Sequence, residues 1–312
     1  MGMSPTNMKT TASFHGIIPP MVTPLVARDQ FDQAGLERLV EHLIAGGVRG
    51  LFLLGTTGEG PSLGYAVRRE LISRTCRQVA DRVAVLVGIT DTSFTESVAI
   101  ACHAAEAGAD AVVLAPPYYL PPAQPELLEY LQRLVSELPL PLFLYNIPSL
   151  TKVTFEPDTV RRAMDEPRII GLKDSGGSMT YFHKLCGLLR YRSDWSLLMG
   201  LEELLCEAIA AGAHGGVCGG ANVFPRLYVS LYEAAIAHDQ DAIRCLHERV
   251  MHVTQSLYQV GRHPSAIIKG IKCALSCLGI CDDFMADPFR RFRAEERARI
   301  AIALKELAEQ GI

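Results

Sequence analysis

A lysine that ends a buried strand is the strongest candidate for chemistry in this sequence. Lys173 follows an apolar run at residues 169–172, which lies between Pro167 and a glycine-rich turn. Such a run predicts a buried strand, and lysine is rarely buried without a partner. Because desolvation favours the neutral amine, Lys173 could attack a carbonyl carbon and form a Schiff base. The alternative is a lysine that only ends the strand and extends to water.

Hydroxyl groups follow two other predicted strands. Thr56 and Thr57 lie among glycines in the loop at residues 55–60, and Ser62 is expected to cap the helix that follows. Two hydroxyls and free backbone N–H groups suit a small carboxylate. Tyr145 ends another predicted strand, one strand before the lysine. A tyrosine usually packs in the core, but beside a strand-end lysine its phenol could act as an acid or base.

Eight short apolar runs predict the strands that would position these groups. They are expected at residues 16–21, 50–54, 83–88, 111–115, 142–145, 169–173, 196–199 and 215–218. Segments of helical period separate most of them, which favours a parallel sheet, and eight such units favour a closed (β/α)8 barrel of the α/β class. No Gly-x-Gly-x-x-Gly follows the first run, which disfavours a dinucleotide-binding sheet. In a barrel, catalytic groups lie at the carboxyl ends of the strands.

The pattern divides the chain into three regions. Residues 1–13 are expected to be a disordered lead-in, and residues 14–237 the barrel that carries the active site. Residues 238–312 show no strand pattern and predict helices at 241–259, 265–278 and 290–310. We expect this C-terminal helical region to pack beside the barrel or at a subunit contact.

Composition excludes several classes of protein. The 312 residues are 49% apolar and 21% charged, and the net charge of −4 comes from interspersed acidic and basic residues. Such a charge distribution gives no footprint for nucleic acid. No apolar stretch approaches the roughly 18 residues of a membrane span. The polar start lacks the apolar core of a signal peptide, and the nine cysteines are scattered singly, which favours free thiols in the cytoplasm. No clustered His and carboxylate ligands occur, so we expect neither a metal nor a cofactor.

Four motifs together resemble the dihydrodipicolinate synthase / N-acetylneuraminate lyase family of pyruvate-dependent class I aldolases. They are Gly-Thr-Thr-Gly-Glu at 55–59, Tyr-Asn-Ile-Pro at 145–148, Gly-Leu-Lys-Asp at 171–174 and Gly-Gly-Val-Cys-Gly-Gly-Ala-Asn at 215–222. The resemblance extends from about residue 14 to the C-terminal helices. It implies a (β/α)8 barrel, a lysine Schiff base with pyruvate or a related 2-oxo acid, no cofactor, and a homotetramer built as a dimer of dimers.

The resemblance also implies roles for single residues. Lys173 would form the imine with the 2-oxo carbon, and Tyr145 would be the acid/base at the carbinolamine and at the aldol oxygen. Thr57 would bind the carboxylate of the 2-oxo acid, and Thr56 would link Tyr145 to solvent. Tyr119 would reach in from a neighbouring subunit. These assignments agree with chemistry, since an iminium makes the C3 proton acidic without the help of a metal.

Four further positions concern the substrate. Val217 would line the pyruvate site at the eighth strand. Glu202 and Glu203 lie where lyase-like members contact a hydroxylated substrate tail, although acidic side chains there could simply complement a helix N-terminus. In dihydrodipicolinate synthases an arginine follows the Tyr-Asn-x-Pro segment and pairs with the carboxylate of aspartate semialdehyde. Leu150 stands at that position here, and an aliphatic group cannot replace a guanidinium.

We therefore expect a Schiff-base aldolase or lyase acting on pyruvate and a 2-oxo acid of the keto-deoxy sugar acid or 4-hydroxy-2-oxoglutarate type. One alternative is a dihydrodipicolinate synthase with a rearranged acceptor site. Another is a keto-deoxy sugar acid dehydratase, because the same enamine can expel hydroxide. A third is a non-catalytic binding protein on the same barrel, which borohydride reduction with pyruvate would separate from the enzymes.

Overall fold

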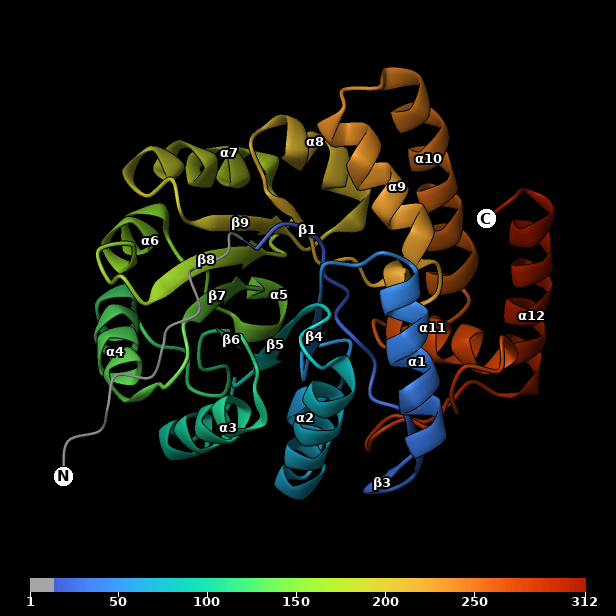
Figure 1. Ribbon diagram of the computed structural model, residues 1–312, viewed down its shortest axis with the longest axis horizontal. Helices are drawn as coiled ribbons and strands as arrows, with labels where there is room; N and C mark the ends of the chain where they lie inside the picture. Colours follow the sequence, from blue (N-terminus) through green and yellow to red (C-terminus); the bar gives the residue numbers. More distant parts are fainter. Residues whose placement is uncertain (1–13) are drawn as a thin grey trace.

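Eight parallel strands form one sheet that closes into a barrel, as Figure 1 shows. The computed structural model describes residues 14–312, so the lead-in expected at residues 1–13 lies outside the described residues. The strands are β1 (Gly16–Ile17), β4 (Gly50–Leu53), β5 (Ala84–Gly88), β6 (Ala111–Leu114), β7 (Leu142–Asn146), β8 (Ile169–Asp174), β9 (Ser196–Met199) and β10 (Gly215–Gly216). Their order in the sheet is β1-β10-β9-β8-β7-β6-β5-β4. The predicted (β/α)8 barrel is confirmed.

The barrel closes where β1 meets β4, and the strand predicted at residues 16–21 is interrupted there. Only its first two residues form β1. The stretch that follows crosses to β4, where the Phe52 N–H donates to the Pro19 carbonyl at 2.9 Å and the Met21 N–H donates to the Phe52 carbonyl at 2.9 Å. A parallel bridge between Pro20 and Phe52 completes the contact. Because proline lacks an N–H, this seam cannot continue as a regular ladder.

Helices surround the sheet (Figure 1). They are α1 (Gln33–Ala45), α2 (Tyr65–Val79), α3 (Phe94–Ala107), α4 (Gln124–Glu137), α5 (Pro148–Thr151), α6 (Pro157–Ala163), α7 (Met179–Leu188), α8 (Leu205–Ala210) and α9 (Pro225–Ile236). Local sequence sets their ends: the Ser93 side chain accepts from the Glu96 N–H to cap α3, and Gly108 ends α3 with φ 93°. Ser62 does not cap α2, since it lies in a short 3₁₀ turn and α2 begins after Gly64.

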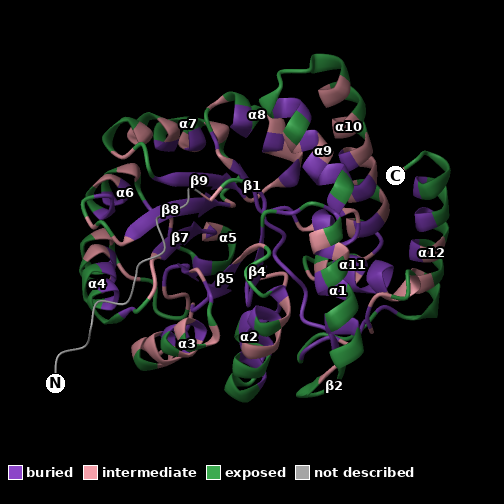
Figure 2. Ribbon diagram, in the orientation of Figure 1, coloured by how far each residue is buried: buried purple, intermediate pink, exposed green. Residues whose placement is uncertain are grey.

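Two layers of apolar side chains make up the core, and the strands are buried throughout in Figure 2. One layer lies between the strands and the surrounding helices. The other fills the barrel interior and consists of Ile18, Phe52, Leu86, Ala111, Val113, Ala115, Phe143, Tyr145, Ile147, Ile170, Leu198 and Val217. Alternate residues of each strand point inward, so bulky side chains of neighbouring strands meet at the same level. Tyr145 and Val217, two of the predicted site residues, belong to this interior layer.

The C-terminal helices lie on one side of the barrel, next to α1 and α9 (Figure 1). They are α10 (Gln240–Val253), a π-helical turn η5 (Thr254–Tyr258), α11 (Ala266–Cys277) and α12 (Ala294–Glu309). A two-stranded hairpin that was not predicted, β2 (Leu25–Ala27) with β3 (Gln30–Phe31), adjoins this region, since Arg28 pairs with Asp287 at 2.6 Å. Over residues 14–312, no helix has the length and apolar character needed to cross a membrane. All nine cysteines are free.

Candidate active site

Lys173 and Tyr145 face each other across two neighbouring strands. In the register of β7 and β8 they are direct partners, and each side chain belongs to a residue that is only 5% exposed. The Lys173 Nζ lies 4.0 Å from the centroid of the Tyr145 ring and 5.2 Å from that of Phe52. The sequence did not indicate Phe52 as a site residue, because an inward-facing phenylalanine is an ordinary core residue. The lysine amine therefore lies among aromatic faces at the top of the barrel interior.

The loop after β4 brings the predicted hydroxyls to this place. The Thr56 Oγ1 lies 3.4 Å from the Tyr145 Oη, a hydrogen bond in which either oxygen could be the donor. The loop is tightly folded: a Cβ on Gly60 would lie 2.1 Å from the Leu54 carbonyl oxygen. Only glycine fits such a contact. Thr57 is half-buried in the same loop. The structure thus places Thr56 in contact with Tyr145. Thr57 is the next residue of the loop and is not part of that contact.

The loops after β9 and β10 complete the surroundings of the lysine. Val217 is 3% exposed, and its N–H donates to the Met199 carbonyl at 2.7 Å. Gly200, directly after β9, is in contact with the lysine: a Cβ there would lie 3.0 Å from the Lys173 Cε and 2.0 Å from the Ser175 Oγ. Gly200 was not predicted as a site residue. A glycine directly after a barrel strand was the available signal, but glycines are common at such ends.

A buried clasp, made by Asn146 and Asp174, joins β7 to β8 next to the Lys173–Tyr145 pair. The Asn146 Nδ2 donates to the Asp174 Oδ1 at 2.7 Å, and the Gly176 N–H donates to the same oxygen at 3.0 Å. The Asn146 Oδ1 in turn accepts from the Phe155 N–H at 3.1 Å. Asn146 is 0% exposed and Asp174 is 1% exposed. Burial raises the pKa of Asp174, although the bonds from Asn146 and Gly176 act in the opposite direction.

Glu202, considered above for a substrate tail, is instead held by the protein. Its Oε1 accepts from the Tyr228 hydroxyl at 2.8 Å and the Tyr258 hydroxyl at 2.7 Å, and its Oε2 accepts from the Gly220 N–H at 2.9 Å. The residue is 4% exposed, and burial raises the pKa of its carboxyl group. The carboxylate therefore ties the loop after β10 to α9 and η5. The expected complement to a helix N-terminus is present in part, since Glu202 lies in the first turn of the 3₁₀ helix η3 (Glu202–Leu204) and accepts from the N–H of Gly220, which begins η4 (Gly220–Asn222); the two tyrosine partners were not predicted.

Tyr119 lies apart from the other predicted site residues. It is 80% exposed, and its neighbour Leu120 is 79% exposed, in the loop between β6 and α4. Leu150 is 52% exposed in α5, directly after β7. A contribution of Tyr119 to a second subunit stays a prediction. Among residues 14–312, no group of three or more His, Cys, Asp or Glu side chains could hold a metal ion.

Comparison with known proteins connects this geometry to a family. A model of the dihydrodipicolinate synthetase family matches residues 13–307. The chain belongs to that family. It is a class I carbon–carbon lyase, of the kind that forms a lysine Schiff base with pyruvate.

The similarity of this chain to individual members of the family varies. A structure described as dihydrodipicolinate synthase from Bacteroides thetaiotaomicron is 53% identical, with a TM-score of 0.91 over 94% of this chain and 98% of that chain. A prophage protein of the family from E. coli K12, solved in complex with pyruvate, is 29% identical, with a TM-score of 0.89 over 95% and 99% of the two chains. The 4-hydroxy-tetrahydrodipicolinate synthase of Hyphomonas neptunium is 32% identical over 93% of this chain and 97% of its own length.

Proposed function

We propose that Lys173 is the Schiff-base lysine of this enzyme. Its place at the carboxyl end of β8, its burial and the aromatic rings 4.0 Å and 5.2 Å from its Nζ support the assignment. The neutral amine adds to C2 of pyruvate, and loss of water from the carbinolamine gives an iminium ion. The iminium withdraws electrons from C3, so that loss of a C3 proton gives an enamine. The position of this one lysine carries the proposal.

Tyr145 is the proposed acid/base. It is the register partner of Lys173, and its hydroxyl is 3.4 Å from the Thr56 Oγ1, which can pass a proton toward solvent. In the bond-forming direction the enamine C3 attacks the aldehyde carbon, and the aldehyde oxygen takes a proton from the Tyr145 hydroxyl. Water then hydrolyses the iminium, which releases the product and the Lys173 amine. Cleavage runs through the same steps in reverse.

We assign recognition of the 2-oxo acid to the loop after β4. Thr57 and the N–H groups of this glycine-rich loop would bind the carboxylate, which orients C2 toward Lys173. Val217, buried in the interior layer, would cover the apolar side of the pyruvate. These contacts are shared by every candidate substrate, because all of them contain a 2-oxo acid.

For the second substrate we propose an acceptor that carries no carboxylate toward α5. Leu150 stands where the family's synthases have an arginine, and its side chain is 52% exposed at the rim. Losing a charge-assisted hydrogen bond costs about 1.5–3 kcal/mol. At about 1.4 kcal/mol per factor of ten, this is a ten- to hundredfold handicap with aspartate semialdehyde. Cleavage of a keto-deoxy sugar acid avoids this cost, because its aldehyde product carries no carboxylate. 4-Hydroxy-2-oxoglutarate avoids it only if the carboxylate of its two-carbon acceptor half points away from α5.

The second candidate is 4-hydroxy-tetrahydrodipicolinate synthase activity, and the names of the relatives favour it. Both the 53% identical structure and the 32% identical curated relative are described as synthases. If this chain shares their activity, another cation must replace the missing arginine. Lys152 is the nearest one in sequence: it ends α5, and its Nζ now donates to the Ser149 carbonyl at 2.9 Å.

One set of assays separates these candidates. Pyruvate and borohydride should add one pyruvate-derived mass per chain, on the peptide that contains Lys173; an adduct elsewhere, or none, rejects the mechanism. Pyruvate release from keto-deoxy sugar acids and 4-hydroxy-2-oxoglutarate should then exceed condensation of pyruvate with aspartate semialdehyde. Leu150→Arg should improve that condensation. Efficient condensation by the wild type, lost in Lys152→Ala, would instead establish the synthase.

We also propose that the enzyme is a cytoplasmic homotetramer arranged as a dimer of dimers. The exposed Tyr119 and Leu120 support a contact between copies, because large apolar side chains at 80% and 79% exposure are costly in water. Tyr119→Ala should weaken the dimer in analytical ultracentrifugation and lower turnover together. A stable tetramer with normal turnover would remove Tyr119 from the site.

A further inference from the structure

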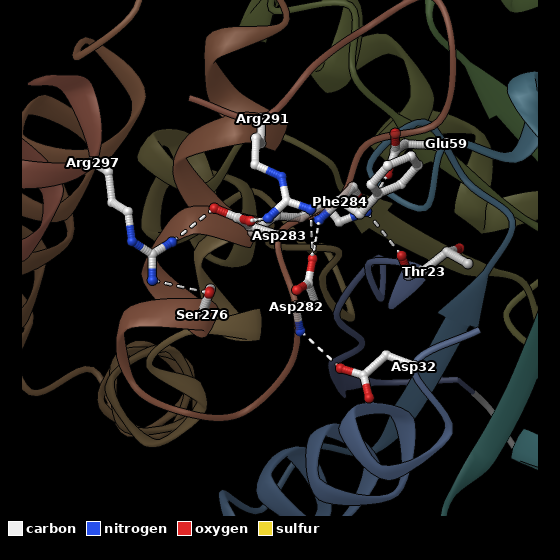
Figure 3. Close-up of polar contacts among 10 residues, drawn as sticks. Thr23, Asp32, Glu59, Ser276, Asp282, Asp283, Phe284, Arg291 and Arg297 are labelled. Carbon is white, nitrogen blue, oxygen red and sulfur yellow. Dashed lines mark hydrogen bonds and ion pairs between the residues drawn. The ribbon is translucent and has the colours of Figure 1, made fainter. Parts of the chain in front are cut away.

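A lysine of the C-terminal helical region is completely buried beneath the loop after β4. Lys272, in α11, is 0% exposed, although an isolated ammonium is among the most costly groups to bury. Its Nζ donates to the Thr23 carbonyl at 2.9 Å, to the Glu59 Oε1 at 2.7 Å and to the Phe284 carbonyl. An ammonium has three donors, so every donor of Lys272 is used inside the protein. The three partner residues, Glu59, Thr23 and Phe284, are drawn in Figure 3.

Glu59 is the partner that belongs to the catalytic loop. It is 4% exposed, and its second oxygen, Oε2, accepts from the Ala286 N–H at 2.8 Å. Both carboxylate oxygens therefore bond to the C-terminal region, one to α11 and one to the segment after it. Glu59 also has φ 57°, a left-handed conformation that a side chain disfavours. The two bonds hold this residue in a conformation that its own backbone would not choose.

The pair acts on the residues proposed to bind the substrate. The Glu59 N–H donates to the Thr56 carbonyl at 3.0 Å, and Thr56 contacts the Tyr145 hydroxyl. Thr23, which accepts from Lys272, donates through its Oγ1 to the Gly58 carbonyl at 2.7 Å. Gly58 and Glu59 directly follow Thr57 in the chain. The backbone on the carboxyl side of both threonines is thus fixed by groups bonded to Lys272.

We propose that Lys272 and Glu59 are a positioning pair that sets the orientation of Thr56 and Thr57, so that a helix outside the barrel takes part in recognition of the 2-oxo acid carboxylate. The proposal rests on the proposed function, because it needs Thr57 to bind that carboxylate. The physical reason is that the reaction rate depends on how accurately the loop is held, since a displacement of about 1 Å in an oriented site can lower the rate on the order of a hundredfold. The pair restrains the loop from outside the substrate site, without touching the substrate.

The competing explanation is that the pair only stabilises the fold. Removing one partner leaves an uncompensated buried charge and is strongly destabilising, so Lys272→Met alone could simply unfold the protein. The double variant Glu59→Gln/Lys272→Met avoids this, since no charge is left buried. Its glutamine keeps an oxygen that can accept from the Ala286 N–H. The double variant can therefore distinguish a positioning role of the pair from a purely stabilising one.

A control variant must lose stability without touching the loop. Arg192→Met serves this purpose: Arg192 precedes β9, at the opposite end of the barrel strands, and donates to the Met164 carbonyl at 2.9 Å. It is part of no proposed substrate contact. Thermal unfolding of the wild type, the control and the double variant establishes that each is folded at the assay temperature and how much stability each has lost.

The experiment measures three quantities in the wild type and in each variant: the KM for pyruvate, kcat, and the labelling of Lys173 by pyruvate and borohydride. We expect the double variant to raise the KM for pyruvate at least tenfold, while saturating pyruvate with borohydride still labels Lys173. Arg192→Met should leave KM unchanged at a similar loss of stability. An unchanged KM in the folded double variant, with normal trapping in the wild type, would overturn the positioning role and leave the proposed function intact. No adduct in the wild type would overturn both.

Discussion

Asp174 offers a direct test of how burial acts next to Lys173, the proposed Schiff-base lysine. Its Oδ1 accepts from the Asn146 Nδ2 at 2.7 Å and the Gly176 N–H at 3.0 Å. Its Oδ2 is buried and has no hydrogen-bond partner among the residues that the structure describes. Asp174→Asn preserves both bonds if the amide oxygen takes the place of Oδ1. The amide nitrogen then occupies the place of the unpartnered oxygen, so the substitution removes the charge and leaves an unpartnered donor in its place.

The sign of the pH effect follows from the raised pKa of Asp174, which burial causes. The folded protein holds the proton more tightly than the unfolded chain, whose aspartate has a pKa of about 3.9. The contribution of Asp174 to stability is therefore greatest below about pH 4 and is lost as the pH rises through its folded pKa. The loss is at most about 1.4 kcal/mol per pH unit for one proton. At low pH, protonated Asp174 and the asparagine both bury an unpartnered donor, so their stabilities should agree within about 1 kcal/mol.

Urea unfolding of both proteins across this pH range measures the difference. We expect the free energy of unfolding of Asp174→Asn, minus that of the wild type, to grow with pH and to become constant above the folded pKa. Other buried acids such as Glu202 titrate in both proteins and cancel in the difference. Tyr181, whose pKa is raised by burial and by Asp174, titrates only at strongly alkaline pH. A difference that stays constant from acid to neutral pH would show that the Asp174 carboxylate is not penalised by burial.

Three further substitutions address the catalytic groups. Tyr145→Phe should lower kcat by roughly 10²–10⁴-fold while pyruvate still adds to Lys173, and near-normal turnover would make the phenol a packing group. Thr57→Val should raise the KM for pyruvate more than it lowers kcat in steady-state assays; the reverse split would contradict carboxylate binding. Gly200→Ala places a Cβ 2.0 Å from the Ser175 Oγ, 2.9 Å from the Asp174 carbonyl oxygen and 3.0 Å from the Lys173 Cε. Since the end of β8 must then shift, the substitution should slow imine trapping on the order of a hundredfold. Trapping at the wild-type rate would show that the lysine is free to move aside.

Sequence patterns located the barrel because its strands are buried on both faces. Continuous apolar runs mark such strands, and the strand at residues 196–199 was predicted with its observed bounds. The hairpin β2–β3 was missed since its strands have only three and two residues and show no alternation to detect. The first strand was predicted too long because its apolar run continues through two prolines, where the chain crosses to Phe52.

The residues at and around the site also fall into two groups, those whose placement the sequence predicts and those whose placement it does not. The placement of Lys173 beside Tyr145 could be predicted because a polar residue at the end of an apolar strand is visible in the sequence, and the barrel then fixes its neighbours. Lys272 could not, because nothing in the local pattern of α11 distinguishes it from Lys269, which is only half-buried. The difference arises from Glu59, a residue 213 positions away in the chain. Contacts of this kind depend on tertiary packing that no local periodicity encodes.

Membership of the family indicates the pyruvate chemistry more firmly than it indicates the acceptor. The reason lies in the difference between the barrel strands β7 and β8 and the short helix α5. Lys173 and Tyr145 lie on adjacent barrel strands with several ladder partners, so their separation cannot change without disrupting the sheet. Leu150 lies in α5, a helix of four residues at the exposed rim. Residues on such short surface elements can be exchanged with little effect on stability. Relatives about 30% identical can therefore share the proposed imine-forming pair and still select different aldehydes, and Leu150→Arg tests our proposal that α5 takes part in that selection.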